Sequence, residues 1–399
     1  MPETDFVNLL IILAIAVLAP LSLGFVPRLR VPAVVLEIVL GIVVGPSGLG
    51  WVEVDLVVEI VALLGLAFLL FLAGLEIDVR ALRGPVLRGA VIGYGLTLVI
   101  GFGAGLGFDA AGWLKSPLLL AICLSATSLG LVVPLLKDAG QVDSPVGQTT
   151  IAASSVADFA AVLMLSLLFS SSDSSTGSKL ILLGLFAGLV VVTAVSISLT
   201  GRSMRLSDVL LRLQDSTAEI RVRAAVTLLI AFVVLAERFG LESILGAFMA
   251  GAAVGLLDRE STSHPNFRAK LEAIGYGFVI PVFFVSSGVR LDITELASSP
   301  SALARVPVFL LALLAVRGLP ALLYLRRLGG LPTMAAGLMQ ATSLPFIVTA
   351  TQIGVLTGLM RPVTAAALVC AGLVSVLVFP ATALSLLTRT KEPTESTTA

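Results

Sequence analysis

One carboxylate lies about halfway along an otherwise apolar stretch of this chain. Asp158 is part of TTIAASSVADFAAVLMLSLLF, where Ser155 and Ser154 precede it by three and four positions, so the three side chains share one face of the expected helix. A charge at the centre of a membrane helix costs roughly 2.5 to 3.5 kcal/mol, which makes such a residue a candidate for function. Hard oxygen ligands suit a hard cation, and a lone carboxylate can exchange that cation for a proton. The alternative is an Asp that only holds helices together through hydrogen bonds to serines.

The second deeply placed charge is Arg317, in VFLLALLAVRGLPALLYLRR. Arg keeps its proton in proteins, so it can act as a fixed counter-charge but not as a proton carrier. Helix C-terminal ends carry partial negative charge, and a cation beside them is stabilised. The alternative is that the long side chain extends toward the membrane surface, beside Arg326 and Arg327.

The four letters ATSL occur twice, at 126–129 and at 341–344, and each copy interrupts a long apolar run. Hydroxyl groups compete for backbone hydrogen bonds and Pro345 has no amide N–H, so each copy weakens its helix. Irregular backbone at membrane depth is tolerated only where it is buried or lines a cavity, so two discontinuous helices in such a place are predicted. In the alternative, the hydroxyl groups bond back within intact helices. The side chains that could satisfy the freed backbone groups are Ser125, Thr127, Ser128, Thr342 and Ser343.

The elements that carry these residues are expected to be membrane-spanning helices. With 57% apolar and only 13% charged residues, the chain lies far outside the range of soluble domains. Charged or Pro/Gly-rich breaks divide it into thirteen apolar stretches near the roughly 20 residues that span a bilayer. The stretches centre near Ala14, Val39, Gly65, Gly95, Ile122, Asp158, Leu189, Ile230, Gly246, Val279, Leu311, Ala341 and Val374.

Charge and composition also set the expected surroundings. Most of the 25 basic residues fall in alternate loops, so the positive-inside rule predicts a cell (inner) membrane protein with its N-terminus outside and its C-terminus in the cytoplasm. Membrane lipids are the expected partners, and no nucleic acid, cofactor or enzymatic activity is expected. GxxxG spacings predict close helix packing at Gly41/Gly45, Gly103/Gly107 and Gly251/Gly255.

Three pairs of segments indicate an internal repeat. VLEIVLGIVVG resembles GLESILGAFMAG, FLAGLEID resembles FVSSGVRLD, and the two ATSL segments form the third pair. In each pair the second copy lies seven predicted helices after the first. An odd offset reverses the direction in which the second copy crosses the membrane. The sequence therefore predicts an inverted-topology repeat, a common build of secondary transporters.

The chain is similar to the monovalent cation:proton antiporter-2 family over nearly its whole length. The motifs that carry the resemblance are VVLEIVLGIVVGPSGLG, FLLFLAGLEIDVRALR, LSATSLGLVVPLLKDAG and PVFFVSSGVRLD. The resemblance implies an all-α fold of 13 transmembrane helices with two crossed discontinuous helices, usually a homodimer. It matches Asp158 to the family's ion-binding aspartate and Arg317 to its basic residue. Ala157 departs from the acidic or amide residue found before that aspartate in related antiporters.

The resemblance also implies an organisation and a function. Residues 1–390 would form one transport domain, with a dimerisation part at 1–83 and 215–296, a core at 84–170 and 297–388, a linker helix at 178–200 and a polar tail at 391–399. No nucleotide-binding regulatory domain is expected in this chain. The implied function is exchange of Na⁺ or K⁺ for H⁺ at Asp158, one for one, with a cation channel or a cation-coupled symporter of organic solutes as the alternative. The expected cation ligands are Asp158, Ser154, Ser155, Thr127 and Ser128.

Overall fold

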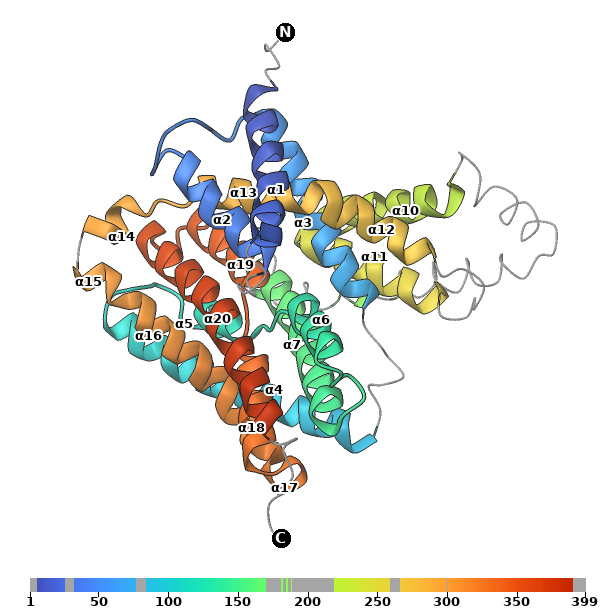
Figure 1. Ribbon diagram of the computed structural model, residues 1–399, viewed down its shortest axis with the longest axis vertical. Helices are drawn as coiled ribbons and strands as arrows, with labels where there is room; N and C mark the ends of the chain where they lie inside the picture. The colour runs from blue at the N-terminus through green and yellow to red at the C-terminus, as the bar shows by residue number, and fades with distance from the viewer. Residues whose placement is uncertain are drawn as a thin grey trace, which may run out of the picture. The chain divides into compact units, whose positions relative to one another are not determined.

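The computed structural model describes residues 6–25, 32–76, 84–169, 219–258, 266–298 and 300–389, together with Ile181, Gly184, Leu185 and Gly188. The described chain is built almost entirely of helices, as its apolar stretches predict (Figure 1). Its membrane-length helices include α1 (Val7–Phe25), α3 (Leu56–Leu75), α4 (Gly84–Ala110), α7 (Pro145–Phe169), α10 (Ile220–Arg238) and α20 (Pro362–Arg389). The shorter helices include α2 (Ala33–Val44), α5 (Pro117–Ser125), α6 (Leu129–Asp138), α11 (Ser243–Asp258), α12 (Asn266–Ile274), α13 (Ile280–Val289), α14 (Thr294–Ser298), α15 (Pro300–Leu303), α16 (Arg305–Leu313), α17 (Leu325–Leu328), α18 (Gly330–Gln340) and α19 (Pro345–Leu356).

Several of these helices are long and apolar enough to cross a membrane. Among the described residues there are 7 such helices, or up to 8 if Gly330–Gln340 and Pro345–Leu356, bent by 42° at their junction, form one span. Shorter apolar helices add to them at Ala33–Val44, Pro117–Val133 and Ser243–Leu256. The predicted stretch centred on Leu189 lies almost wholly outside the described residues. The protein is therefore an all-α polytopic membrane protein, and its helices are compatible with the predicted thirteen.

The chain divides into two compact units, of which the first comprises residues 1–17, 52–77 and 162–286. Its core is the pair α3 and α11, which pack so closely that a Cβ atom on Gly251 would collide with the carbonyl of Phe71. Gly74 is confined in the same way by the carbonyl of Phe248. Glycine lets these two backbones touch, as the spacing Gly251/Gly255 predicts.

The second unit comprises residues 18–51, 78–161 and 287–399. Within it α4 packs on α5, while α20 packs on both α18 and α16; α18 and α20 run side by side in Figure 1. The Gly41/Gly45 spacing on α2 also gives close packing, because a Cβ atom on Gly45 would lie 2.9 Å from the Cα atom of Val289. For Gly103 and Gly107, by contrast, no atom of the described residues lies within 4 Å of the position of a Cβ, so the predicted close packing is not found in this part of the chain.

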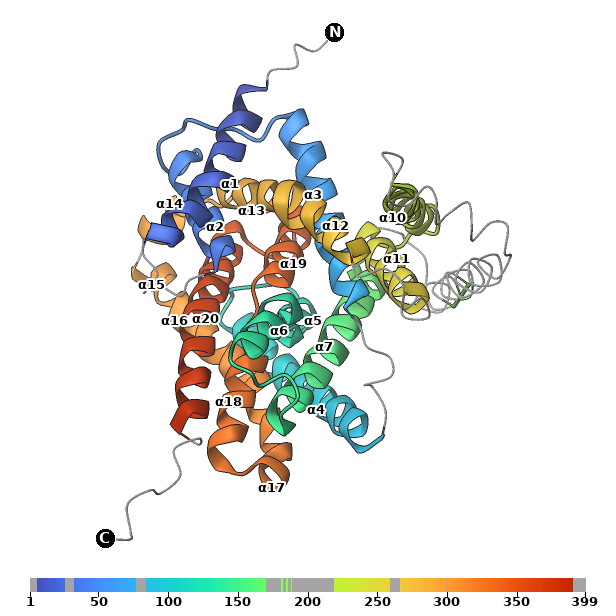
Figure 2. The same ribbon diagram turned by 45° about the vertical axis from the view of Figure 1, so that its right-hand side comes forward.

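Two long helices of the second unit are broken at the predicted places. The first stops at Ser125 and resumes at Leu129, and the second stops at Gln340 and resumes at Pro345. Figure 2 shows the connecting segments of the two breaks lying close together, and the backbone N–H of Ser128 donates to the carbonyl of Thr342 at 2.9 Å. We call residues 126–128 and 341–344 together the crossing. Both ATSL motifs therefore mark the breaks that the sequence predicts.

The helix that carries Arg317 is also irregular. Leu314–Gly318 forms a single turn of π-helix, and Leu319–Tyr324 continues as 3₁₀-helix. Pro320 explains the change, because proline has no N–H to donate to the carbonyl four residues earlier and its ring crowds that carbonyl. Gly318 faces Gly337 of α18, where a Cβ atom on Gly337 would lie 3.2 Å from the Gly318 carbonyl oxygen. This close approach brings Arg317 against the end of α18.

Candidate ion-binding site at the crossing

The Asp158 carboxylate, on α7, lies against the first turn of α6, the helix that follows the first break. Its Oδ1 accepts a hydrogen bond from the backbone N–H of Thr127 at 3.1 Å, and its Oδ2 accepts one from that of Leu129 at 3.2 Å. The N-terminal end of a helix carries partial positive charge and unpaired N–H groups, so it is a favourable place for an anion. An ionised carboxylate is also a hard oxygen ligand that can bind a cation or take up a proton.

The Arg317 guanidinium lies at a helix C-terminus, which carries partial negative charge. Its side chain is 2% exposed, and Nε lies 3.3 Å from the carbonyl oxygen of Gln340, the last residue of α18. Nε and Nη2 also donate to Thr127 Oγ1 at 3.0 and 2.6 Å. Nη1 lies 3.4 Å from Thr97 Oγ1 on α4. The guanidinium is therefore buried at the negative end of a half helix, which favours the predicted fixed counter-charge over an extended, surface-directed side chain.

Thr127 connects the two charges. Its backbone N–H binds Asp158, while its hydroxyl accepts from Arg317 and lies 2.7 Å from the Gln340 carbonyl oxygen, to which it donates. The hydroxyl is therefore already engaged by the arginine. Its role as a cation ligand stays a prediction.

The remaining predicted residues lie around the same crossing. Ser154 and Ser155 are buried one turn before Asp158 on α7, and Ser154 Oγ has no hydrogen-bond partner among the described residues. Ser128 contributes its backbone N–H to Thr342 rather than a side-chain cap to α6. Thr342 Oγ1 bonds back to the Leu338 carbonyl at 3.1 Å, although the helix itself is broken after Gln340.

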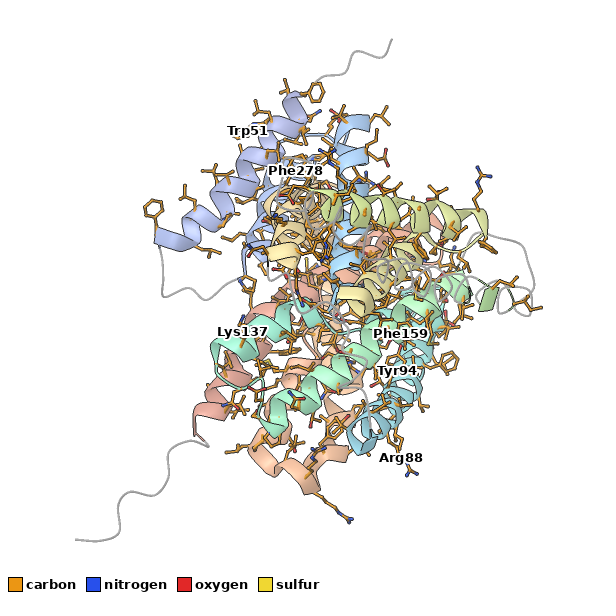
Figure 3. All side chains as sticks on the ribbon, turned by 90° about the vertical axis from the view of Figure 1, so that its right-hand side faces the viewer. Trp51, Arg88, Tyr94, Lys137, Phe159 and Phe278 are labelled. Carbon is orange, nitrogen blue, oxygen red and sulfur yellow. The ribbon has the colours of Figure 1, made fainter. Side chains whose placement is uncertain are left out.

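Four residues that sequence analysis did not single out also belong to this network. Thr97 and Gln340 bind the guanidinium, and Ser375 Oγ of α20 accepts from the backbone N–H of Ser343 at 3.3 Å. On α4, Tyr94 Oη lies 3.0 Å from Ser125 Oγ at the end of α5; Figure 3 labels Tyr94, with Arg88 nearer the start of that helix. A weak signal was present, since each is a polar residue within an apolar run.

The second break repeats the arrangement of the first with a neutral group. Asp158 of α7 accepts from N–H groups at the start of α6, and Ser375 of α20 accepts from an N–H group just before the start of α19. The helices α5, α6 and α7 thus correspond to α18, α19 and α20, as an internal repeat predicts. Only the first set carries a carboxylate at that place.

Known proteins resemble this chain over most of its length. The family described as "Sodium/hydrogen exchanger, transmembrane" matches residues 13–389. A protein named putative Na⁺/H⁺ antiporter YjbQ, from Bacillus subtilis, is 31% identical over the whole of this chain, which spans 66% of that relative's length. The Na⁺/H⁺-K⁺ antiporter GerN of Bacillus cereus is 29% identical, over 66% of this chain and 66% of GerN.

The fold has a solved counterpart. The structure of the sodium proton antiporter MjNhaP1 from Methanocaldococcus jannaschii superposes with a TM-score of 0.67 at 19% identity, covering 96% of this chain and 98% of that one. Such a likeness shows that the fold is shared. Together with the family match over nearly the whole sequence, it identifies this chain as a member of the sodium/hydrogen exchanger family.

Proposed function

We propose that this protein exchanges a monovalent cation, Na⁺ or K⁺, for H⁺ across the cell membrane, with Asp158 as the shared site. The observation that carries the proposal is the placement of the Asp158 carboxylate at the start of α6, where two backbone N–H groups hold both of its oxygens. A cation and a proton would compete for the same carboxylate oxygens. Family membership and the antiporter names of YjbQ and GerN support the same function.

The proposed cation site consists of Asp158 with oxygen atoms of neighbouring residues. Ser154 and Ser155 lie on the same helix, and Thr127 and Ser128 belong to the crossing. Arg317 would stay charged and hold the crossing together in both loaded states. Thr342 and Ser343 belong to the second segment of the crossing, residues 341–344.

Transport would proceed by alternating access in a homodimer with its N-terminus outside. In this proposal the core, 84–170 and 297–388, moves against the dimerisation part, 1–83 and 215–296, and the linker helix 178–200 joins them. Most of that linker lies outside the described residues, as does the tail 391–399.

The test is the collapse of an imposed pH gradient in liposomes that contain purified protein, on addition of Na⁺ or K⁺. We expect the cation to release protons with wild type, whereas Asp158→Asn should abolish the response, because an amide cannot exchange a proton for a cation. Asp143→Asn makes the same chemical change at an exposed position between α6 and α7 and should leave the response intact.

Two results would contradict the proposal. Full activity of Asp158→Asn would remove Asp158 as the shared site. Cation uptake by the wild type without proton movement would instead favour a channel or a cation-coupled symporter.

A further inference from the structure

The face of α7 that carries Asp158 continues as a buried polar stripe toward Pro145. Thr150 and Ser154 lie eight and four residues before Asp158, so helical spacing puts the three on one face. Both side chains are 0% exposed, and neither Thr150 Oγ1 nor Ser154 Oγ has a hydrogen-bond partner in the described part of the chain. Native proteins seldom bury a hydroxyl without a partner, and a bound water or ion is one explanation for such a group.

These two hydroxyls differ from others on the same kind of helix. The neighbouring Thr149 Oγ1 donates to the carbonyl oxygen of Pro145 at 2.7 Å. Thr349 and Thr351 of α19 likewise donate to carbonyls four residues earlier. A back-bond of this type is the usual way for a Ser or Thr to be satisfied within a helix. Thr150 and Ser154 therefore keep their hydrogen-bonding capacity for something else.

The Gln340 carboxamide of the second unit is a third buried polar group without a complete set of partners among the described residues. Val146 of α7 and Ala336 of α18 pack in one apolar cluster, which also includes Val132 of α6. One helical turn from these residues toward the crossing are Thr150 on α7 and Gln340 on α18. Gln340 is 2% exposed, and its Nε2 has no partner among the described residues. By this helical spacing, the Thr150 and Gln340 side chains lie on the side of the apolar cluster that faces the crossing.

We propose that Thr150, Ser154 and the Gln340 carboxamide form a subsite for a partly dehydrated monovalent cation on its way to or from Asp158. The inference rests on the antiport function proposed above and extends it by a set of neutral oxygen ligands on the Pro145 side of Asp158. Hydroxyl and amide oxygens are hard ligands of the type that such a cation needs when it leaves water. The carboxamide carries an acceptor oxygen beside its nitrogen, so rotation of the Gln340 side chain turns that oxygen toward the ion.

Thr150→Val tests the subsite, because it removes the hydroxyl and keeps the shape of the side chain. We expect the cation concentration for half-maximal proton release in liposomes to rise about tenfold, the effect of losing one hydrogen-bond-strength ligand. Thr150→Ser keeps the hydroxyl and should behave as wild type. Thr149→Val is the matched control, since the Thr149 hydroxyl is already satisfied by Pro145.

A second readout is independent of transport. A cation that binds the folded protein raises its unfolding temperature, and the midpoint of that rise reports affinity. In detergent, Thr150→Val should shift the midpoint for Na⁺ or K⁺ to about tenfold higher concentration, and Gln340→Met should do the same while leaving the backbone carbonyl that Thr127 uses.

The outcomes distinguish failure of the subsite from failure of the antiport function on which it rests. If wild type exchanges cations for protons and Asp158→Asn does not, but Thr150→Val and Gln340→Met match wild type in both assays, the subsite is wrong and the antiport proposal stands. If wild type exchanges nothing, both fail. A Thr150→Val protein that does not fold leaves Gln340→Met to decide, with unchanged cation affinity overturning the subsite.

Discussion

Arg317 joins three helical segments through a single guanidinium group. Its Nε and Nη2 atoms both donate to Thr127 Oγ1, Nε also faces the Gln340 carbonyl, and Nη1 faces Thr97 Oγ1. Arg offers five N–H donors in a rigid fork, whereas the Lys ammonium is a compact charge on a flexible chain. The geometry of this site therefore requires the fork as well as the charge.

This leads to a prediction for Arg317→Lys. The variant keeps a positive charge at the end of α18 but cannot reach Thr127 and Thr97 with separate, fixed donors. We expect the free energy of unfolding to fall by about 2 kcal/mol, the scale of hydrogen bonds to a charged group. Thermal unfolding in detergent measures this, with Arg361→Lys at an exposed position as the control. Equal stability of Arg317→Lys and wild type would show that charge alone suffices.

At this scale the sequence predicts charged residues better than neutral ones. Asp158 and Arg317 stand out because placing a charge in an apolar membrane helix costs free energy, so such a residue is a candidate for function. Thr150 and Gln340 do not stand out, because a Ser, Thr or Gln in a helix is usually satisfied by its own backbone or by a neighbour. Only the fold shows that Thr149 is satisfied in this way while the adjacent Thr150 is not.

Helix breaks and helix contacts depend on different signals. Both breaks at the crossing were predictable, because two ATSL motifs and Pro345 weaken the helix locally. The π-turn at Leu314–Gly318 was not predicted, although Pro320 marks it. Close packing is harder still to predict, since a GxxxG spacing shows that a helix has a small face but not that another helix lies against it. That is why, among the described residues, Gly251/Gly255 packs closely against another helix and Gly103/Gly107 does not.

The same contrast predicts opposite effects of Gly→Ala. In Gly251→Ala the new methyl group would meet the Phe71 carbonyl, so α3 and α11 must separate. Overpacking of this kind costs about 1–3 kcal/mol. In Gly103→Ala the methyl group meets nothing within 4 Å, and replacing a helical glycine should stabilise the protein by about 0.5–1 kcal/mol. Unfolding temperatures in detergent should therefore move in opposite directions, and a shared direction would contradict the packing of these helices.

For the whole molecule, the number of titrating and fixed charges at the crossing determines whether transport moves net charge. The first half of the repeat presents a carboxylate to a helix start, and the second half presents the Ser375 hydroxyl. Ala157, directly before Asp158, supplies no second acid, and Arg317 keeps its charge throughout. The crossing thus offers one carboxylate that can lose a proton when it binds a cation. The charge on the moving site is then the same whether it carries H⁺ or one monovalent cation.

Electroneutral one-for-one exchange is the expected consequence. A potassium-selective ionophore can impose a membrane voltage on liposomes loaded with sodium, and the rate and end-point of Na⁺-driven proton release should not depend on that voltage. Ala157→Asp provides the contrast, because a second acid beside Asp158 gives the site a second proton to exchange and should make transport voltage-dependent. A wild-type end-point that shifts with voltage would require another titrating group, and the one-carboxylate mechanism would then be wrong.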